Sequence, residues 1–291
     1  MKAPRRWTGC LSLTLCVVLA AMTSTQAGGP PGFTFDKDRG LWTGQLPSEH
    51  NATPSQLEIM LPEPLEAGRK YPVLYLLPVG KRGGEYGDAM VEAKKADLAN
   101  KLGVICVEPT FSSSPWLGNH ATDPGIQQDD FMVKSLVPFI DANLPVLAKP
   151  EGRWLMGFSK SGWGAMTLIL RHPDVFGYAA VWDAPLMLDG SKADWGPMGL
   201  KRNFGTKEKM LEFLPTTLVK QKGAQLGDKP RIVLAPGQAW TPQVKGFRTL
   251  LDQLKIPYVY RDDLISKHRW DSGWFEPMAV ELAKIAKPAA E

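Results

Sequence analysis

The sequence is poor in the side chains that build metal sites and disulfide frameworks. Its 291 residues include three cysteines and four histidines, which are scattered along the chain. Cys10 and Cys16 lie near the N-terminus, and Cys106 is the one cysteine after residue 27. A structural zinc site needs closely spaced Cys or His ligands, and a disulfide needs a second cysteine. With no phosphate-binding loop either, neither a metal nor another cofactor is expected.

The sequence also has only a small excess of positive over negative charge. The net charge is +4, and three basic residues fall within the first 27, so residues 28–291 carry a net charge of +1. This near-neutral balance does not favour binding to nucleic acid or to an anionic membrane surface.

Long apolar runs are missing except for one near the N-terminus. Three basic residues precede an apolar stretch at 10–22, and small residues suited to signal peptidase follow at 25–27. The stretch is too short for a comfortable membrane span. Residues 1–27 are therefore predicted to be a removed signal peptide of the bacterial export type. The mature protein is then expected to be secreted or periplasmic, with no membrane partner.

Short apolar runs alternate with amphipathic segments over the rest of the chain. The strand-like runs are 57–61, 71–77, 104–107, 154–158, 178–182, 232–235 and 258–260. The helix-like segments are 88–101, 131–144, 244–254 and 278–285. Most runs are apolar on both faces, which is typical of central strands in a parallel sheet. The alternation predicts an α/β fold with a mostly parallel, doubly wound sheet and helices on both faces, in one domain over 28–291.

One long interval, 184–230, separates two of the predicted strands. It contains Trp195 and a helix-like segment at 207–213. Long connections of this kind often cover an active site, so the interval is predicted to be a lid or excursion.

The stretch GFSKSGWGAM, residues 157–166, lies at the end of a predicted strand and opens a helix. This context is typical of the nucleophile elbow G-x-S-x-G, in which small residues flank a serine held in strained backbone geometry. Gly157 fits the first position, and Ser161 stands where the second glycine is usual. The pattern predicts that Ser159 is a nucleophile; its alternative role is to cap a helix.

A serine nucleophile needs a general base. In a fold of this type the base comes from the loop after the last strand, where His268 lies. His172 is placed at the end of the helix that Ser159 opens, a position favoured by the helix dipole. His50 lies in the N-terminal part, and His120 is a candidate for lining the cleft. His268 is therefore the predicted base.

Four stretches, YPVLYLLP, GFSKSGWGAM, RHPDVFG and KHRWDSGW, resemble the esterase D family of α/β-hydrolases. That family includes feruloyl and acetylxylan esterases, S-formylglutathione hydrolase and the mycolyltransferases. The resemblance covers most of residues 55–285. It implies an α/β-hydrolase fold and the hydrolysis of a carboxylic ester through an acyl-enzyme on Ser159.

The sequence departs from the family after the second predicted strand. The family's Leu-Leu-His-Gly is replaced by Leu-Leu-Pro-Val at 76–79, followed by Gly80. The resemblance implies an oxyanion hole made of two backbone N–H groups, those of Lys160 and Gly80. Backbone donors survive a change of side chain, so this departure is compatible with catalysis.

A second departure concerns the acid of the triad. The family's usual Asp after the seventh strand is missing, because 234–241 reads LAPGQAWT. Asp183, which ends the run at 178–182, lies at the same edge of the sheet and is the predicted replacement, although an Asp-Ala-Pro sequence also begins turns. Asp262 and Asp263, just before His268, are the alternatives, as is a triad without an acid.

The residues together predict a secreted serine esterase that acts on a polysaccharide or another extracellular ester. Trp116, His120 and Trp195 are the candidate substrate-binding residues, since indole rings suit sugar rings or aromatic acyl groups. An acyltransferase would use the same site. A degenerate hydrolase that binds a saccharide or a protein is the other alternative, and it predicts that Asp183 points away from His268.

Overall fold

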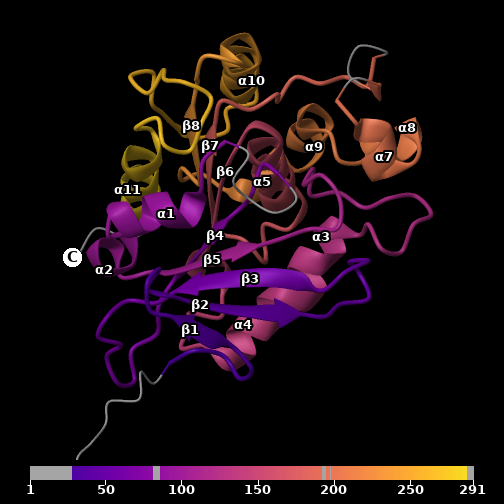
Figure 1. Ribbon diagram of the computed structural model, residues 1–291. Helices are drawn as coiled ribbons and strands as arrows, with labels where there is room; N and C mark the ends of the chain where they lie inside the picture. Colours follow the sequence, from indigo (N-terminus) through magenta and orange to yellow (C-terminus); the bar gives the residue numbers. More distant parts are fainter. Residues whose placement is uncertain (1–27, 81–85, 192–194, 197, 287–291) are drawn as a thin grey trace, which may run out of the picture.

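The computed structural model describes residues 28–80, 86–191, 195–196 and 198–286. The predicted signal peptide, residues 1–27, lies outside these ranges, and its removal stays a prediction. Within the described ranges no helix is both long and apolar enough to cross a membrane. Figure 1 shows one central sheet with helices packed on its two faces.

The sheet is mostly parallel. Its nine strands, as far as the chain is described, lie in the order β1-β2-β3-β5-β4-β6-β7-β8-β9. The three N-terminal strands pair antiparallel, as does β3 with β5, and all pairs from β5 to β9 are parallel. The strands are β1 (Thr34–Asp36), β2 (Leu41–Leu46), β3 (Ser55–Met60), β4 (Val73–Leu76), β5 (Ile105–Pro109), β6 (Arg153–Phe158), β7 (Tyr178–Trp182), β8 (Ile232–Ala235) and β9 (Val259–Tyr260).

The predicted strands agree with this sheet. β7 and β8 occupy the predicted ranges, and the other five differ from theirs by one or two residues at their ends. The strands β1 and β2 were not predicted, because they are largely half-exposed and have no continuous apolar run. They form by antiparallel pairing along β3, and Figure 1 shows them in indigo at one end of the sheet.

The helices follow the predicted alternation, with one interruption. The α-helices are α1 (Ala89–Lys95), α2 (Leu98–Leu102), α3 (Gln128–Asp130), α4 (Val137–Asn143), α5 (Ser159–Arg171), α7 (Leu200–Phe204), α8 (Lys207–Leu211), α9 (Pro215–Lys222), α10 (Thr241–Gln253) and α11 (Phe275–Ala286). A π-helical segment, Phe131–Leu136, leads into α4, and 3₁₀ turns occupy Pro150–Gly152 and Gly223–Leu226. The predicted helix at 88–101 is split because Asp97 adopts a left-handed conformation (φ 51°) between α1 and α2.

Two apolar layers enclose the sheet. Alternate residues of a strand point to opposite faces, so Tyr75 packs with α4, α5, α9 and α10 while Leu74 packs with α1, α2 and α11. Strand residues buried on both faces explain the continuous apolar runs in the sequence. The predicted α/β fold class is confirmed by this arrangement.

The interval 184–230 forms a packed substructure that includes α7, α8 and α9. Its apolar residues make a third cluster with Trp116 and with Trp163 of α5. The predicted helix at 207–213 corresponds to α8. The interval is therefore anchored to the helix that Ser159 begins.

Three carboxylates gather where β3 pairs with β5. Glu58 lies opposite Glu108 in the strand register, and one carboxylate oxygen from each, together with one from Asp88, lies within 4.8 Å of the others. Arg39 forms ion pairs with Glu58 and Asp88. Glu108 is 8% exposed, and burial raises its pKa well above the usual range, with the charges of Asp88 and Glu58 adding to the effect.

Because its pKa is raised on folding, Glu108 binds more protons in the folded than in the unfolded state, whose pKa is about 4.3. The free energy of unfolding therefore falls as pH rises from about 4.3 through the folded pKa. We expect Glu108→Gln to raise the melting temperature relative to wild type more at about pH 8 than at about pH 5. Thermal unfolding at both pH values measures this, with the exposed Glu49→Gln as control. An equal effect at the two pH values would contradict the prediction.

Candidate active site

Ser159 lies at a sharp turn between β6 and α5. The strand ends at Phe158 and the helix begins at Ser159, whose φ of 54° is in the left-handed region. This conformation is costly for a residue with a Cβ and is held here by surrounding contacts. The Ser159 N–H donates to the carbonyl of Asp183 at 3.1 Å, and the residue is 8% exposed. These features are those of a nucleophile elbow.

Small residues around Ser159 are required by close packing. A Cβ on Gly157 would lie 2.6 Å from the carbonyl oxygen of Ser161, and one on Gly162 would lie 2.9 Å from the Cβ of Ala184. Ser161, in the place of the usual second glycine, has its own contacts. Its hydroxyl donates to the Phe158 carbonyl at 2.9 Å and accepts the Phe158 N–H at 3.3 Å. Ser161 therefore departs from the elbow pattern but stabilises the turn through these two hydrogen bonds.

Asp183 contacts His268 directly. Asp183 follows β7, is completely buried and has a left-handed φ of 42°. Its Oδ2 lies 2.7 Å from Nδ1 of His268, which comes from the loop between β9 and α11. A carboxylate in this position fixes the tautomer and orientation of an imidazole, leaving Nε2 to take up a proton.

The loop after β8, which lacks the acid of the related enzymes, surrounds Asp183. The N–H of Ala239 donates to Oδ2 at 3.0 Å, and that of Trp240 donates to Oδ1 at 2.6 Å. A Cβ on Gly237 would lie 2.5 Å from Cγ of Asp183. Sequence reasoning missed this backbone cradle, although the glycine in the loop is a signal of close backbone approach.

Aromatic rings hold His268 beside the elbow. Phe158, the residue before Ser159, contacts the imidazole edge-on with a centroid distance of 4.9 Å. Trp182 stacks on it at 6.1 Å, and Tyr86 meets it edge-on at 5.8 Å. The hydrogen bonds of the described residues include none between Ser159 Oγ and His268. Such bonds are often long in ligand-free sites and shorten when substrate binds.

The two predicted oxyanion donors lie at the same edge of the sheet. Lys160 is the second residue of α5, where backbone N–H groups lack an intrahelical partner. Gly80 is buried and follows β4, the strand that pairs with β6. Just beyond β4, the N–H of Leu77 donates to the carbonyl of Met156 at 2.9 Å and keeps this segment beside β6. The roles of Lys160 and Gly80 stay predictions.

The alternative acids and the other candidate base have different partners. Asp263 is bound to Arg261 at 2.7 Å, and Asp262 is exposed. His172 Nε2 lies 2.9 Å from Asp129 at the far end of α5. Among the carboxylates of the described residues, Asp183 is therefore the one hydrogen-bonded to His268.

The prediction that Trp116 lines the cleft is wrong. Its indole is fully buried and meets Trp163 edge-to-face with a centroid distance of 5.4 Å. A ring of this size supplies much apolar area. Here that area joins the segment after β5 to α5 and to the interval 184–230.

His120 and Trp195 are also used structurally. Nδ1 of His120 accepts the N–H groups of Thr122 and Asp123 at 3.1 and 2.8 Å, which stabilises a turn. The half-buried Trp195 packs against the apolar cluster of the interval 184–230. Both side chains are half-buried, and their substrate-binding roles stay predictions.

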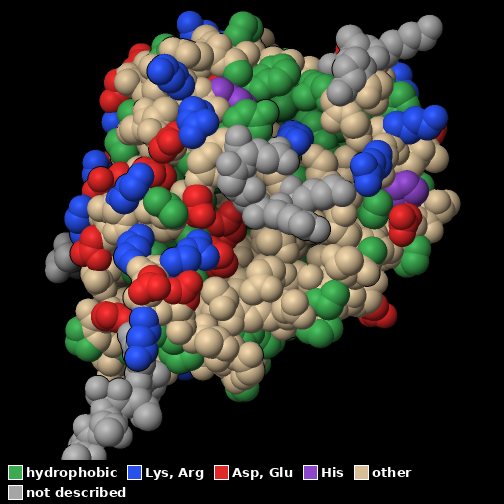
Figure 2. All heavy atoms as spheres, viewed as in Figure 1, with side chains coloured by type: hydrophobic (Ala, Val, Ile, Leu, Met, Phe, Trp, Pro, Cys, Tyr) green, Lys and Arg blue, Asp and Glu red, His purple; other side chains and the backbone are tan. Residues whose placement is uncertain are grey.

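Exposed apolar side chains come from the segments that carry Asp183 and His268. Tyr86 and Met187 are each 39% exposed, and Ile265 is 53% exposed. Tyr86 touches His268, Met187 follows Asp183 by four residues, and Ile265 precedes His268 by three. Figure 2 shows an apolar hollow on the viewed face, with a histidine and a basic side chain at its border.

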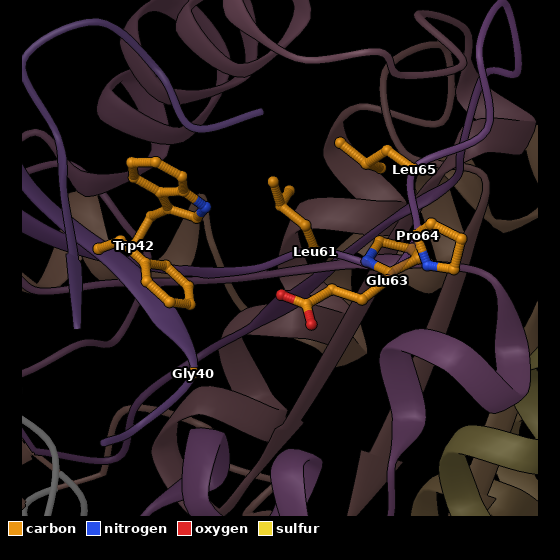
Figure 3. A pocket seen from close by; sticks show the side chains of 8 residues that line it. Gly40, Trp42, Leu61, Glu63, Pro64 and Leu65 are labelled. Carbon is orange, nitrogen blue, oxygen red and sulfur yellow. The ribbon is translucent and has the colours of Figure 1, made fainter. Parts of the chain in front are cut away.

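A further hollow of 580 Å³ lies elsewhere. Figure 3 shows it between Trp42 of β2 and the segment after β3, with the Glu63 carboxylate among the lining side chains. Because β3 is antiparallel to β5, the C-terminal end of β3 lies at the amino edge of the parallel strands. This hollow is thus at the opposite edge of the sheet from Ser159.

Comparison with known proteins agrees with this geometry. A family model described as "Putative esterase" matches residues 112–240, which include the elbow, Asp183 and the loop around it. A protein named esterase from Mycobacterium tuberculosis is 26% identical over 173 residues, or 58% of this chain and 35% of its own length. The chain thus spans about a third of the length of that curated relative.

Solved structures share the fold over most of the chain. A ferulic acid esterase has a TM-score of 0.65 at 19% identity, with 84% of this chain and 96% of that chain covered. An S-formylglutathione hydrolase from Staphylococcus aureus has a TM-score of 0.64 at 15% identity, with 85% and 98% covered. The family model and the named relative confirm the resemblance to the esterase D-like family, and the solved structures confirm the α/β-hydrolase fold.

Proposed function

We propose that this protein is a serine esterase that hydrolyses carboxylic esters through an acyl-enzyme. The observation that carries the proposal is the 2.7 Å contact between Asp183 and His268 beside the strained turn at Ser159. Ser159 follows β6, Asp183 follows β7, and His268 lies in the loop after β9. A nucleophile, an orienting acid and a base are the three groups that serine-based acyl transfer uses.

In the proposed reaction, Ser159 Oγ attacks the acyl carbonyl carbon while Nε2 of His268 takes the hydroxyl proton. Asp183 accepts the hydrogen bond from Nδ1–H and stabilises the imidazolium. The backbone N–H groups of Lys160 and Gly80 receive the developing oxyanion. The imidazolium then protonates the departing alkoxide. A water molecule, deprotonated by His268, attacks the acyl-enzyme and releases the acid.

The contact between Asp183 and His268 favours an enzyme over a degenerate binding protein, which predicts that the two point apart. An acyltransferase retains the same residues and differs in the acceptor, a sugar hydroxyl in place of water. The family match and the relatives named esterase or hydrolase support hydrolysis.

The substrate is proposed to be an extracellular ester, such as an acylated polysaccharide. The signal-like sequence at 1–27 supports export to the periplasm or the medium. The exposed Tyr86, whose ring meets His268 edge-on, supplies apolar surface beside the histidine, which suits a hydrophobic part of the ester.

The first test is the hydrolysis of 4-nitrophenyl acetate by wild type, Ser159→Ala and Asp183→Asn. We expect Ser159→Ala to fall to the background rate and Asp183→Asn to lose activity by up to about 10⁴ in kcat, because the imidazole loses its orienting acid. Asp263→Asn, a control that removes an exposed carboxylate, is expected to keep wild-type activity. Full activity in Ser159→Ala would overturn the proposal.

The hydrogen-bond partners of the Asp183 side chain, Ala239, Trp240 and His268, can all donate to it, so the NH₂ group of an Asn would face other donors. Thermal unfolding of Asp183→Asn, measured alongside, separates a loss of the acid from a loss of the fold. Activity retained in a folded Asp183→Asn would remove Asp183 from the mechanism.

A second test displaces the acid without removing it. Gly237→Ala would place a Cβ 2.5 Å from Cγ of Asp183, so the carboxylate or the loop must shift. Since small errors in position are costly in catalysis, we expect kcat to fall by about 10²-fold. Gly246→Ala, in α10, is the control, because that glycine has no left-handed φ and its new Cβ would meet only side-chain atoms of Met187, at 3.2 Å or more. Wild-type kcat in a folded Gly237→Ala would contradict the role of the cradle.

A further inference from the structure

Lys160 places a cation across the carboxyl edge of the sheet, directly after Ser159. Its side chain is half-buried, and Nζ lies 3.0 Å from Oγ of Ser114 in the segment that follows β5. The strand order there is β5-β4-β6. Ser114 lies five residues beyond the end of β5, so the Lys160 side chain runs from the turn after β6 to the segment after β5.

The position of this ammonium is fixed by a buried network. Gln128 is 1% exposed, and its Nε2 donates to the Ser114 carbonyl at 3.1 Å and to Ser113 Oγ at 3.0 Å. Ser113 Oγ in turn donates to the buried Asn203 at 2.8 Å. The half-buried Ser114 that anchors the ammonium is thus bonded to buried residues, and Lys160 itself directly follows Ser159.

A fixed ammonium so close to the nucleophile acts on whatever ester binds there. An ester placed for attack by Ser159 has the atoms on one side of its scissile bond near Lys160. An anionic group within a few ångströms of a lysine ammonium gains Coulomb attraction and a charge-assisted hydrogen bond. An uncharged ester gains neither.

We propose that Lys160 is a specificity-determining residue that selects esters carrying a carboxylate or another anionic group near the scissile bond. This inference rests on the proposed esterase function and narrows its substrate class. The apolar surface of Tyr86 and the cation of Lys160 together describe an amphiphilic site, suited to an ester with one apolar and one anionic part.

Two matched pairs of chromogenic esters test the proposal. The first pair is the 4-nitrophenyl hemiester of adipic acid and 4-nitrophenyl hexanoate, which differ by a carboxylate on the acyl side. The second is 3-carboxy-4-nitrophenyl acetate and 4-nitrophenyl acetate, which differ on the alcohol side. For each pair, kcat/KM of the anionic ester is divided by that of the neutral ester in wild type, Lys160→Gln, Lys160→Arg and Lys267→Gln.

We expect the ratio for at least one pair to fall about tenfold in Lys160→Gln, since removal of one close charge pair costs about that factor. Lys160→Arg keeps the charge and is expected to keep the ratio within about threefold. Lys267→Gln is the matched control, because it removes the same charge from an exposed residue next to His268. A ratio that is equal in wild type and Lys160→Gln for both pairs overturns the inference.

Wild-type kinetics give an independent measurement in case Lys160→Gln does not fold. Raising salt from about 0.02 M to about 0.5 M is expected to lower the anionic-to-neutral ratio, and an unchanged ratio overturns the inference. The Ser159→Ala variant separates the two proposals. If it hydrolyses all four esters as fast as wild type, the proposed function fails; if wild type alone is active but Lys160 does not matter, only the inference fails.

Discussion

The buried carboxylate of Asp183 is the contact on which the site depends. A fully buried ionised group is strongly unfavourable unless it is paired and hydrogen-bonded. Asp183 receives N–H donors from Ala239 and Trp240 and contacts Nδ1 of His268, while its backbone carbonyl accepts the N–H of Ser159. One residue thereby ties together the end of β7, the loop after β8, the histidine loop and the elbow.

The strand order is compatible with the proposed acid, Asp183, standing after β7 instead of after β8. These strands are neighbours in the sheet, and β6 lies on the other side of β7. Neighbouring strands are separated by only about 4.8 Å, so a carboxylate moved by one strand still reaches a histidine that hangs over the same edge. The loop after β8 has no carboxylate, and its backbone N–H groups donate to Asp183.

The environment of the site combines packing with charge. Phe158, Trp182 and Tyr86 confine the imidazole of His268, so its orientation does not rest on one hydrogen bond alone. Trp270 and Trp274 are almost fully buried and pack against Phe158. Lys160 and its anchor at Ser114 add a cation to this largely apolar surface. This mixture is the basis of the proposed preference for a substrate with both apolar and charged parts.

Local patterns in the sequence were sufficient for the parallel strands, the main helices and the strand-turn-helix context of Ser159, because apolar periodicity and short motifs depend on neighbouring residues. The same patterns proposed Ser159 as nucleophile and His268 as base. They also pointed to Asp183 by its place at a strand end. Tertiary structure alone showed that the 237–240 loop surrounds Asp183, that β1 and β2 pair along β3, and that Lys160 reaches Ser114. It also placed Trp116 in the interior, against Trp163. These features depend on which strand ends and loops become neighbours in space, and no local pattern records that.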